Sequence, residues 1–382
     1  MKVEFYKHNL GREEKQNVLE CLDGIFLTTG QYVKDFEAQF AEYLGVKHVV
    51  GLTSCTAALQ LSLLALGVGP GDEVITTPMT FIATANAICH VGAKPIFVDV
   101  EADTGLLDPL KIEKAITRWT KAIIPVHLYG QMCDMKAIST IARKHGLYVV
   151  EDCAHCVEGK RDGVRPGDLS EAACYSFYAT KNLTCGEGGA VATNDLKTAE
   201  KIFLLRQHGM SKSAADRYVS TYQHWDMVEL GWKYNMNNIQ AAILLPQIKR
   251  IEERWQKRAD LYKNYRKALG GLSEVSQPKI VKGSKSAYHL FTVWAVAAQR
   301  DALLKKLNEK GVGAAVNYRA IHLLSFYSKK FKFKPGDYPN AEKIGAQTIS
   351  LPFWIGLRQQ EINFVASVIH SFLKHSKKAL GE

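Results

Sequence analysis

The sequence predicts an α/β protein with a large domain, built on a mostly parallel central sheet covered by helices, and a smaller C-terminal α+β domain. Strand-like and helix-like segments alternate through the first half of the chain, as they do in βαβ units. Short groups of small or polar residues follow several predicted strands, at the end of the sheet where ligands bind. We therefore expect a large domain over 1–250, followed by a long connecting helix and a small domain over 251–382.

In the first half of the chain, apolar residues recur at helical spacing in some segments and form short runs in others. The predicted helices cover 11–24, 31–44, 57–66, 81–91, 109–117, 134–145 and 196–207. The predicted strands cover 49–50, 74–77, 95–100, 122–127, 147–150, 172–177 and 190–193. We expect the first helix, 11–24, to pack on the small domain.

The second half begins with a polar and aromatic segment, 208–235, which contains Arg217 and Tyr222 and is expected to be ordered. Residues 237–267 are predicted to form one long helix with a kink at Pro246, because proline cannot donate the helical backbone hydrogen bond. The smaller domain is then expected to contain strands 288–298 and 313–318 and helices 299–310, 340–346 and 358–375.

The composition limits the kinds of partner. A net charge of +11 favours anionic partners such as phosphate-bearing ligands. The basic runs 329–334 and 374–378 are typical of solvated faces, and no nucleic-acid motif stands beside them, so we expect no nucleic-acid partner. The N-terminus lacks the apolar core of a signal peptide, and no run of about 18 apolar residues exists, so we expect no membrane insertion. Eight cysteines in such a chain are expected to be reduced thiols in the cytoplasm.

One stretch carries the strongest candidate for chemistry. Lys181 follows the apolar strand 172–177 and precedes the glycine-rich turn 186–189. A lysine amine attacks carbonyl groups once it has lost its proton, which burial promotes, and glycine lets the backbone approach a ligand closely. A strand–loop–strand with a surface lysine remains the alternative, because glycine-rich turns are common.

Three further positions fit the same kind of site. Ser54, before a predicted helix, could bind an anion at the helix N-terminus or simply cap the helix. Asp152, at a strand end, could pair with the protonated ring nitrogen of a pyridoxal cofactor or cap the next segment. Phe81 could stack on a flat ring or belong to the core.

The segment Cys153-Ala-His-Cys156 allows other interpretations. It could be a redox pair, which needs an exposed cysteine of lowered pKa, or part of a zinc site, which needs a second pair of ligands that is not evident. Buried structural thiols fit better, because free cysteine packs like a small apolar residue. We therefore expect no metal.

Taken together and in this order, these residues resemble the DegT/DnrJ/EryC1/StrS family of sugar aminotransferases, which have fold type I. The resemblance runs nearly end to end. Its motifs are Leu27-Thr-Thr-Gly-Gln-Tyr-Val-Lys-Asp-Phe-Glu37, Ser54-Cys-Thr-Ala-Ala-Leu59, Gly71-Asp-Glu-Val-Ile75, Pro125-Val-His-Leu-Tyr-Gly130, Glu151-Asp-Cys-Ala-His155, Ser176-Phe-Tyr-Ala-Thr-Lys181, Gly231-Trp-Lys-Tyr-Asn-Met236 and Ile349-Ser-Leu-Pro352.

The resemblance implies pyridoxal 5′-phosphate as cofactor, with pyridoxamine 5′-phosphate as its intermediate form, and assigns roles to residues. Lys181 would bind the cofactor covalently and move protons, Asp152 would hold the ring nitrogen, and His155 would lie near the ring oxygen. The other residues implied to bind the cofactor are Ser54, Cys55, Thr56, Phe81, Ser176 and, from the partner subunit of a homodimer, Asn235. The residues implied to bind the substrate are Thr29, Gly30, Lys233, Tyr318, Arg319 and His322, with His322 also a catalytic candidate.

Two positions depart from the family pattern. Cys55 stands where glycine or alanine is common, which changes the bulk of the loop. Many members read Gly-Tyr-Asn-Tyr-Arg where this chain has Gly231-Trp-Lys-Tyr-Asn235, a form similar to the branch that aminates C4 of UDP-4-keto sugars. Lys233 and Asn235 are therefore both candidates for the cross-subunit phosphate ligand, and the match to that branch favours Asn235.

The function implied by the resemblance is transamination of a nucleotide-linked 4-keto-6-deoxy sugar, with L-glutamate as donor, in lipopolysaccharide or surface polysaccharide biosynthesis. The alternatives are amination at C3 and a non-catalytic regulator that binds sugar nucleotides. Dehydration at C3 is disfavoured because members with that activity replace the lysine by histidine, whereas this chain keeps Lys181.

Overall fold

The computed structural model describes residues 1–211 and 224–380. Its larger sheet has seven strands in the order β1-β7-β6-β5-β4-β2-β3. Their bounds are β1 His48–Leu52, β2 Glu73–Thr76, β3 Lys94–Phe97, β4 Thr120–Ile123, β5 Tyr148–Asp152, β6 Ala172–Ser176 and β7 Gly189–Thr193. Only β7 among these strands runs antiparallel to its neighbours, β1 and β6. The mostly parallel sheet predicted from the sequence is therefore confirmed.

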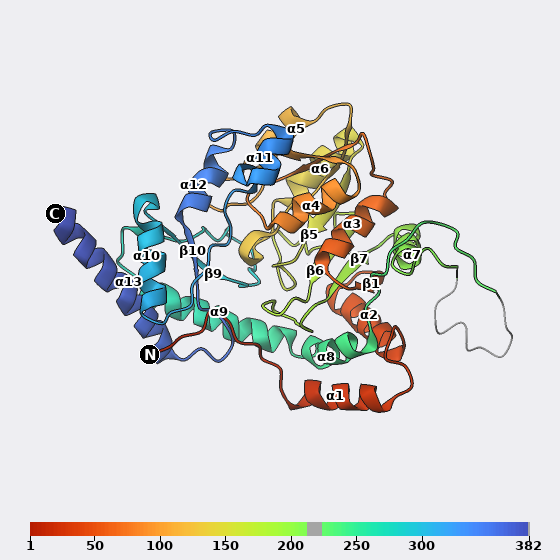
Figure 1. Cartoon of the computed structure of the whole chain (residues 1–382), viewed down its shortest axis with the longest axis horizontal. Coiled ribbons are helices and arrows are strands. Elements are labelled where there is room, and N and C mark those ends of the chain that lie inside the picture. Colours follow the sequence, from red (N-terminus) through yellow and green to blue (C-terminus); the bar gives the residue numbers. More distant parts are fainter. Residues whose placement is uncertain (212–223, 381–382) are drawn as a thin grey trace.

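Both faces of this sheet are covered by helices (Figure 1). Along β6 successive side chains point to opposite faces, so Tyr175 packs with Phe36 and Phe40 of α2, while Cys174 packs on the side of α3. The helices of the large unit are α1 Arg12–Asp23, α2 Gln31–Leu44, α3 Cys55–Ala65, α4 Ile82–His90, α5 Pro109–Ala115, α6 Met135–His145, α7 Leu196–Leu205 and α8 Asn238–Ile248. Burial on both faces explains why the central strands read as continuous apolar runs.

The small unit contains a three-stranded antiparallel sheet, β10-β9-β8, which lies toward the left of Figure 1. Its strands are β8 Val275–Ser276, β9 Phe291–Ala295 and β10 Thr348–Leu351. Its other elements are α9 Ile251–Ala268, α10 Ala297–Glu309, α11 Ser325–Phe331, α12 Pro339–Gln347 and α13 Gln359–Leu380. One apolar cluster joins α9, α10 and α13 to the β9 side chains. The domain boundary near residue 250 stays a prediction.

The long helix predicted over 237–267 is two helices, so that prediction was wrong. Pro246 lies inside α8, and the chain leaves helical geometry only at Arg250, where φ is −114° and ψ is 12°. The carbonyl of Ala242, four residues before Pro246, cannot receive the usual helical hydrogen bond and instead accepts one from Asn17 Nδ2 at 3.2 Å. This external partner lets α8 continue past the proline.

A further expectation differs from the structure. Residues 313–318 do not form a strand, because the Gly313 N–H donates to the Val3 carbonyl while Ala315 pairs with Ser350, so these residues have no continuous partner strand. The helix α1 packs along α8 (Figure 1), and its Glu14 also pairs with Arg254 of α9, so its packing on the small domain stays a prediction. Val3, further toward the N-terminus, is the residue that joins the small unit's core.

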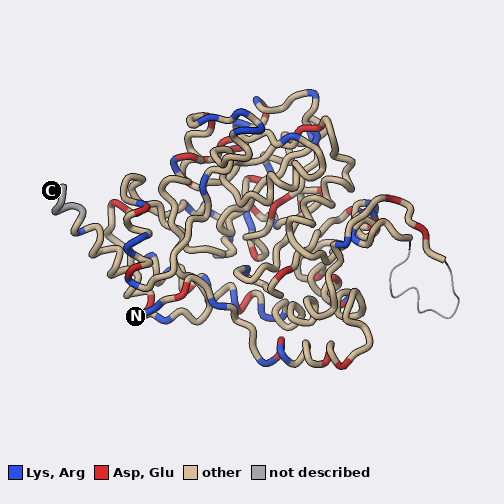
Figure 2. The backbone as a smooth tube through the Cα atoms, in the orientation of Figure 1, with Lys and Arg blue, Asp and Glu red and all other residues tan. Residues whose placement is uncertain are grey.

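The surface carries mixed charge. Figure 2 shows basic and acidic residues interspersed along the chain in this view. Within residues 1–211 and 224–380, no helix combines the length and apolar character needed to cross a membrane. Arg217 and Tyr222, in the segment expected to be ordered, lie outside the described residues.

Candidate active site

A cavity of about 540 Å³ lies beyond the carboxyl ends of the parallel strands. Residues from the ends of β5 and β6, from the loop that follows β1, and from the loop before α4 converge on it. The sequence-predicted residues that line it are Ser54, Cys55, Thr56, Phe81, Asp152, His155, Ser176, Lys181 and Tyr318. The structure thus brings together most of the candidates that the sequence placed at separate strand ends.

Lys181 extends into this cavity from the loop after β6. Burial disfavours the ammonium form and lowers the pKa of the Lys181 amine to about 8, although the nearby Asp152 and Cys55 groups oppose the shift. An amine with this pKa is substantially neutral in mildly alkaline solution, and only the neutral amine attacks a carbonyl carbon. The surface-lysine alternative is therefore not supported.

The pH dependence of Lys181 reactivity gives a first test. In cofactor-free protein, reductive modification of Lys181 by a small aldehyde should rise with pH through a midpoint of about 8, where half of the amine is neutral, and then level off. Peptide mass spectrometry at each pH would measure the label on Lys181, with exposed Lys144 of the same sample as the control for the reagent. Asp152→Asn should move the Lys181 midpoint to lower pH, since Asp152 stabilises the ammonium. A Lys181 midpoint near pH ~10.4, the ordinary value of a lysine amine, would contradict the assignment.

Asp152 ends β5 and is held by two hydrogen bonds. Thr84 Oγ1 donates to its Oδ2 at 2.8 Å, and the Ala154 N–H donates to its Oδ1 at 3.1 Å. Burial raises the pKa of the carboxyl, and these two donors oppose that rise. Sequence reasoning missed Thr84, whose position one helical turn after Thr80 was the available signal. The result is an oriented carboxylate in a buried site.

The N-terminus of α3 forms one wall of the cavity. Ser54 Oγ accepts from the Ala57 N–H at 3.1 Å, so the serine caps the helix and also lines the cavity. Gly189 of β7 allows this close packing, because a Cβ there would lie 2.2 Å from the Ser54 carbonyl carbon and 2.5 Å from the Cys55 nitrogen. First-turn N–H groups with the hydroxyls of Thr56 and Ser176 make a donor set that fits a phosphate group.

His155 and two aromatic residues form another wall. The Tyr129 N–H donates to His155 Nδ1 at 3.2 Å, which places the ring proton on Nε2, 3.1 Å from the Tyr318 hydroxyl. Burial, with the charge of Lys181, lowers the pKa of His155 and keeps the ring neutral. Phe81 is 54% exposed and its ring lies 5.7 Å from that of Tyr318, so it faces the cavity and is not a core residue.

A second group of candidates lies together but outside the cavity lining. Asn235 Nδ2 donates to Thr29 Oγ1 at 2.7 Å, and the Gly30 N–H donates to Asn238 Oδ1 at 3.0 Å. Among the described residues, Asn235 Oδ1 is a buried oxygen without a hydrogen-bond partner. Lys233 pairs through its backbone with Gln207. The cross-subunit role of Asn235 and the substrate-binding roles of Thr29, Gly30 and Lys233 stay predictions.

His322 and Arg319 are also outside the lining of this cavity. His322, in the short 3₁₀ turn Ile321–Leu323, is fully buried, with Nε2 3.0 Å from Glu342 Oε1. The adjacent Ile321 N–H donates to the Pro78 carbonyl at 2.8 Å, which ties this turn to the loop that carries Phe81. A catalytic role for His322 stays a prediction, since the single chain does not place it against the cavity.

The Cys153–Cys156 segment is built into the core. Burial raises the pKa of both thiols, so neither has the lowered pKa of a redox cysteine. Donor atoms of His127, Glu151 and Cys153 lie within 4.8 Å of one another. However, His127 Nε2 contacts Glu151 at 2.6 Å, and the other Glu151 oxygen accepts from Gly167 and Ser170, so protein groups already satisfy both side chains.

Comparisons with known proteins show what the whole chain is similar to. A model of the DegT/DnrJ/EryC1/StrS aminotransferase family matches residues 8–370. The chain is 40% identical over 371 residues to the spore coat polysaccharide biosynthesis protein SpsC of Bacillus subtilis, covering 96% of this chain and 95% of SpsC. It is 36% identical over 369 residues to the GDP-perosamine synthase of Caulobacter vibrioides, covering 95% and 96%. The structure of Spr1654 from Streptococcus pneumoniae in its PMP form matches with a TM-score of 0.92 at 29% identity, covering 98% of this chain and 100% of that one.

Proposed function

Because the chain belongs to the DegT/DnrJ/EryC1/StrS aminotransferase family, we propose that it aminates a nucleotide-linked 4-keto-6-deoxy sugar, with L-glutamate as the amino donor. It is a pyridoxal-phosphate-dependent sugar aminotransferase of fold type I. Our proposal concerns three points beyond this activity, namely the position of the keto group, the nucleotide and the amino donor. The observation that carries the proposal is the partly neutral Lys181 amine in one cavity with the Asp152 carboxylate and the α3 N-terminus.

The residues of the cavity fit this cofactor. Asp152 would pair with the ring nitrogen, Phe81 would stack on the ring, and the α3 N-terminus with Ser176 would hold the phosphate. When bound, the cofactor stabilises negative charge that develops on the donor's α-carbon. Gly189 lets β7 pack directly against the backbone of Ser54 and Cys55, which would hold the phosphate-binding loop in place.

The protein's own groups supply positioning and proton movement. Lys181 Nζ, when neutral, can accept a proton from the donor's α-carbon in the first half of the reaction, and its ammonium form can give a proton to the sugar's keto carbon in the second half. Thr84 and Ala154 hold Asp152 in the orientation that favours a protonated ring nitrogen. His155 and Tyr318 close one side of the cavity, and their mutual hydrogen bond fixes both rings there.

The proposal of a nucleotide sugar has two supports. The Gly231-Trp-Lys-Tyr-Asn235 form resembles the branch that aminates C4 of UDP-4-keto sugars, and one relative is by name a GDP-perosamine synthase. The test incubates the holoenzyme and L-glutamate with UDP-, dTDP- and GDP-linked 4-keto-6-deoxy sugars, and with the corresponding 3-keto sugars, and identifies the product by mass spectrometry and NMR. A 4-amino sugar is expected with one nucleotide preferred. Amination only of 3-keto sugars would favour the C3 alternative, and binding without turnover would favour a regulator.

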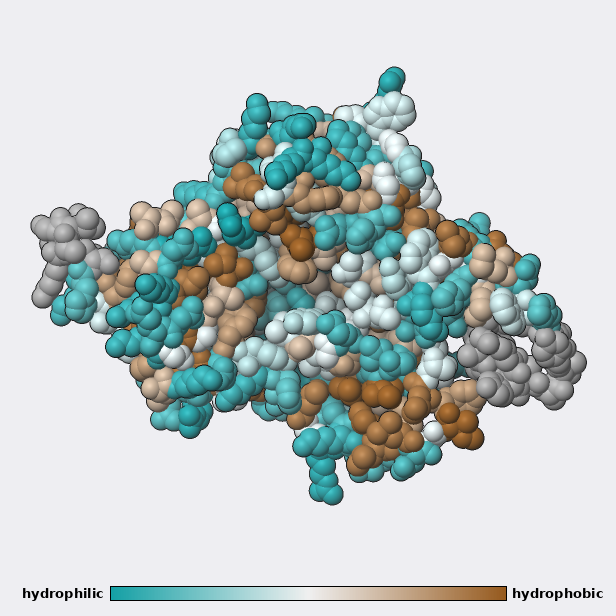
Figure 3. Space-filling view, viewed as in Figure 1, coloured by the Kyte–Doolittle hydropathy of each residue, from teal (hydrophilic) through white to brown (hydrophobic). Residues whose placement is uncertain are grey.

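We also propose a homodimer with composite sites in the cytoplasm. Figure 3 shows an apolar area over α1, where Leu19 and Leu22 are exposed, as are Ile25, Phe26 and Leu27 in the loop that follows. A contiguous exposed apolar area is typical of a surface that another protein covers. The loop leads directly to Thr29, the hydrogen-bond partner of Asn235. The eight cysteines, all described, are free thiols, which supports a reducing compartment.

Mixing two inactive variants tests the dimer. With Lys181→Ala and Asn235→Ala subunits exchanged, one site of each heterodimer carries both lesions and the other carries neither, if Asn235 acts across the interface. Activity should therefore return toward half of the wild-type value per dimer, measured as sugar product formed. Native mass spectrometry confirms the heterodimer, and each variant is assayed alone. No recovery in confirmed heterodimers would show that Asn235 acts within its own chain.

A further inference from the structure

A second, smaller cavity adjoins Lys181. Its volume is about 40 Å³, room for a few waters or one carboxylate group. Lys181 and Thr180 line both this cavity and the larger one. Its other walls come from α8, α9, the loop before β9, the turn at 353–355 and the N-terminal segment 6–9. The cavity thus adjoins the lysine at which the amino donor must react.

The lining of this small cavity is rich in basic side chains. Lys7, Arg254 and Arg258 supply its positive charge, and His8, His289 and Lys181 also line it. Among the described residues that line it, there is no aspartate or glutamate. Burial, with the charges of Lys181 and Arg258, lowers the pKa of His289, as expected beside cationic groups. A small anion is the ligand that such a lining favours.

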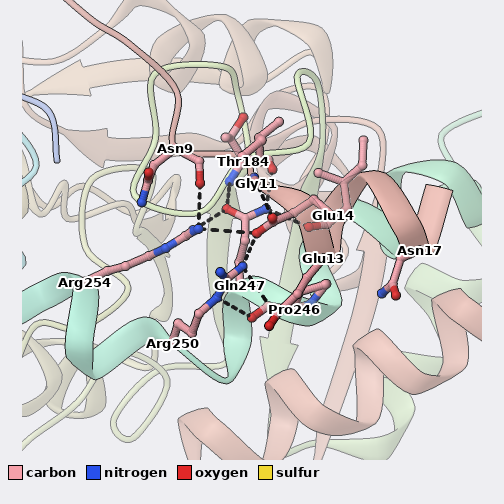
Figure 4. A network of polar contacts seen from close by, with 12 residues as sticks. Asn9, Gly11, Glu13, Glu14, Asn17, Thr184, Pro246, Gln247, Arg250 and Arg254 are labelled. Atoms are coloured by element: carbon pink, nitrogen blue, oxygen red, sulfur yellow. Dashed lines mark hydrogen bonds and ion pairs between the residues drawn. The ribbon is translucent and has the colours of Figure 1, made fainter. Parts of the chain in front are cut away.

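The two buried arginines of this lining, Arg254 and Arg258, differ in whether both terminal guanidinium nitrogens have hydrogen-bond partners. Arg254 points toward Asn9 and Gln247 (Figure 4), with Nη1 donating to Gln247 Oε1 at 2.9 Å and Nη2 donating to the Asn9 carbonyl at 2.8 Å. With a further contact between Nη2 and Glu14, both terminal nitrogens of Arg254 have protein partners.

Only two of the three guanidinium nitrogens of Arg258 have a protein partner among the described residues. Its Nη2 is paired with Glu158, and its Nε donates to the Ala287 carbonyl at 3.3 Å. Within the described part of the chain, no hydrogen-bond partner of its Nη1 is found. The Tyr6 hydroxyl, which also belongs to the lining, is a buried oxygen without a partner among those residues. Two donors of the same cavity are therefore available to a ligand.

We propose that this cavity binds the α-carboxylate of the amino donor, with Arg258 Nη1 and the Tyr6 hydroxyl as hydrogen-bond donors. The inference rests on the proposed aminotransferase function and names how its donor is recognised. In an α-amino acid the carboxyl carbon is two bonds from the amino nitrogen, so the carboxylate must sit beside the reacting amine. A cavity that opens at Lys181 and is too small for a nucleotide satisfies this requirement.

The N-terminal segment that supplies Tyr6 is anchored to the small unit. The Trp354 indole donates to the Glu4 carbonyl at 3.2 Å, and the ammonium of Lys7 lies 4.8 Å from the centre of a Trp354 ring. These contacts place the Tyr6 side chain over the cavity on an ordered backbone. Residues far apart in the sequence, Tyr6 and Arg258, thereby form one recognition site.

The test separates the two halves of the reaction. The holoenzyme is mixed with L-glutamate or with L-alanine, and loss of the cofactor's visible absorbance gives the second-order rate constant for the donor. Arg258→Lys keeps a charge for Glu158 but loses the guanidinium fork, so this constant should fall about 10- to 100-fold for both donors. Tyr6→Phe, which removes only a hydroxyl, should lower it about fivefold. Cofactor binding, and the reaction of the amino form of the enzyme with its keto sugar, should be unchanged in both variants.

A matched control is Arg250→Lys. Arg250 also pairs with a buried glutamate, Glu14, but does not line the cavity, so its donor constants should equal those of the wild type. A wild-type enzyme that fails to react with any amino acid donor would reject the proposed function itself. A wild-type enzyme that reacts, with unchanged constants in Arg258→Lys and Tyr6→Phe, would reject only the carboxylate site. A defect seen with glutamate alone, or one equally large in the sugar reaction, would also overturn the assignment to the α-carboxylate.

Discussion

Replacing Lys181 by alanine is expected to lower the transamination rate about 10²- to 10⁴-fold, the usual contribution of a positioned general base. Among the described residues that line the large cavity, Lys181 is the one lysine. Burial lowers the pKa of its amine to about 8, so a substantial fraction of the amine is neutral. The rate would be measured as amino sugar formed per site, in protein reconstituted with pyridoxal phosphate. Cofactor content after gel filtration would be measured in parallel, because the variant also loses the covalent attachment point.

Two controls make this result specific. Lys144→Ala removes an exposed lysine paired with Glu113 and should leave the rate within error of the wild type. A small primary amine added to Lys181→Ala should restore part of the activity, since it can take the place of the missing base in the cavity. Near-normal turnover in Lys181→Ala without added amine would contradict the role assigned to this residue.

Replacing Asp152 by asparagine is the second change with a large expected effect. The neutral amide has nearly the same shape but cannot favour a protonated ring nitrogen, so turnover should fall about 10²- to 10⁴-fold. The phosphate-binding residues on α3 and β6 are untouched, so the cofactor should remain bound after dialysis. Turnover and the absorbance of the dialysed protein are the two measurements.

Thr84→Val provides the matched control for Asp152. It removes one of the two hydrogen bonds to the carboxylate and leaves the charge in place, so turnover should fall only about tenfold. Turnover close to wild type in Asp152→Asn, with cofactor still bound, would mean that the carboxylate serves only to cap the segment after β5.

Much of the fold could be predicted because its signals are local. The apolar run at β6 and the helical spacing of Val33, Phe36 and Phe40 each reflect burial on a face that the neighbouring residues define. Ser54 was predicted at a helix start for the same reason, and it is the observed N-cap of α3. Lys181 could be found because a strand end followed by glycines is visible in a short window of sequence.

The remaining features depend on contacts between distant residues. α8 continues past Pro246 because Asn17, in another helix, satisfies the Ala242 carbonyl, and no local pattern indicates this. Residues 313–318 have strand-like composition, yet their backbone partners, Val3 and Ser350, belong to different segments. In the site, Arg258 pairs with Glu158, which is 100 residues away in the sequence. The sequence therefore could not indicate which guanidinium nitrogen of Arg258 is left without a partner.

The covalent attachment of pyridoxal phosphate to Lys181 is the central claim, and one measurement tests it most directly. The wild-type holoenzyme is reduced with borohydride, which fixes the carbon–nitrogen bond between cofactor and lysine, and the digested protein is then mapped by tandem mass spectrometry. The account predicts one modified peptide, with the phosphopyridoxyl mass on Lys181. The label on another lysine, or no label on protein shown to contain the cofactor, would contradict it.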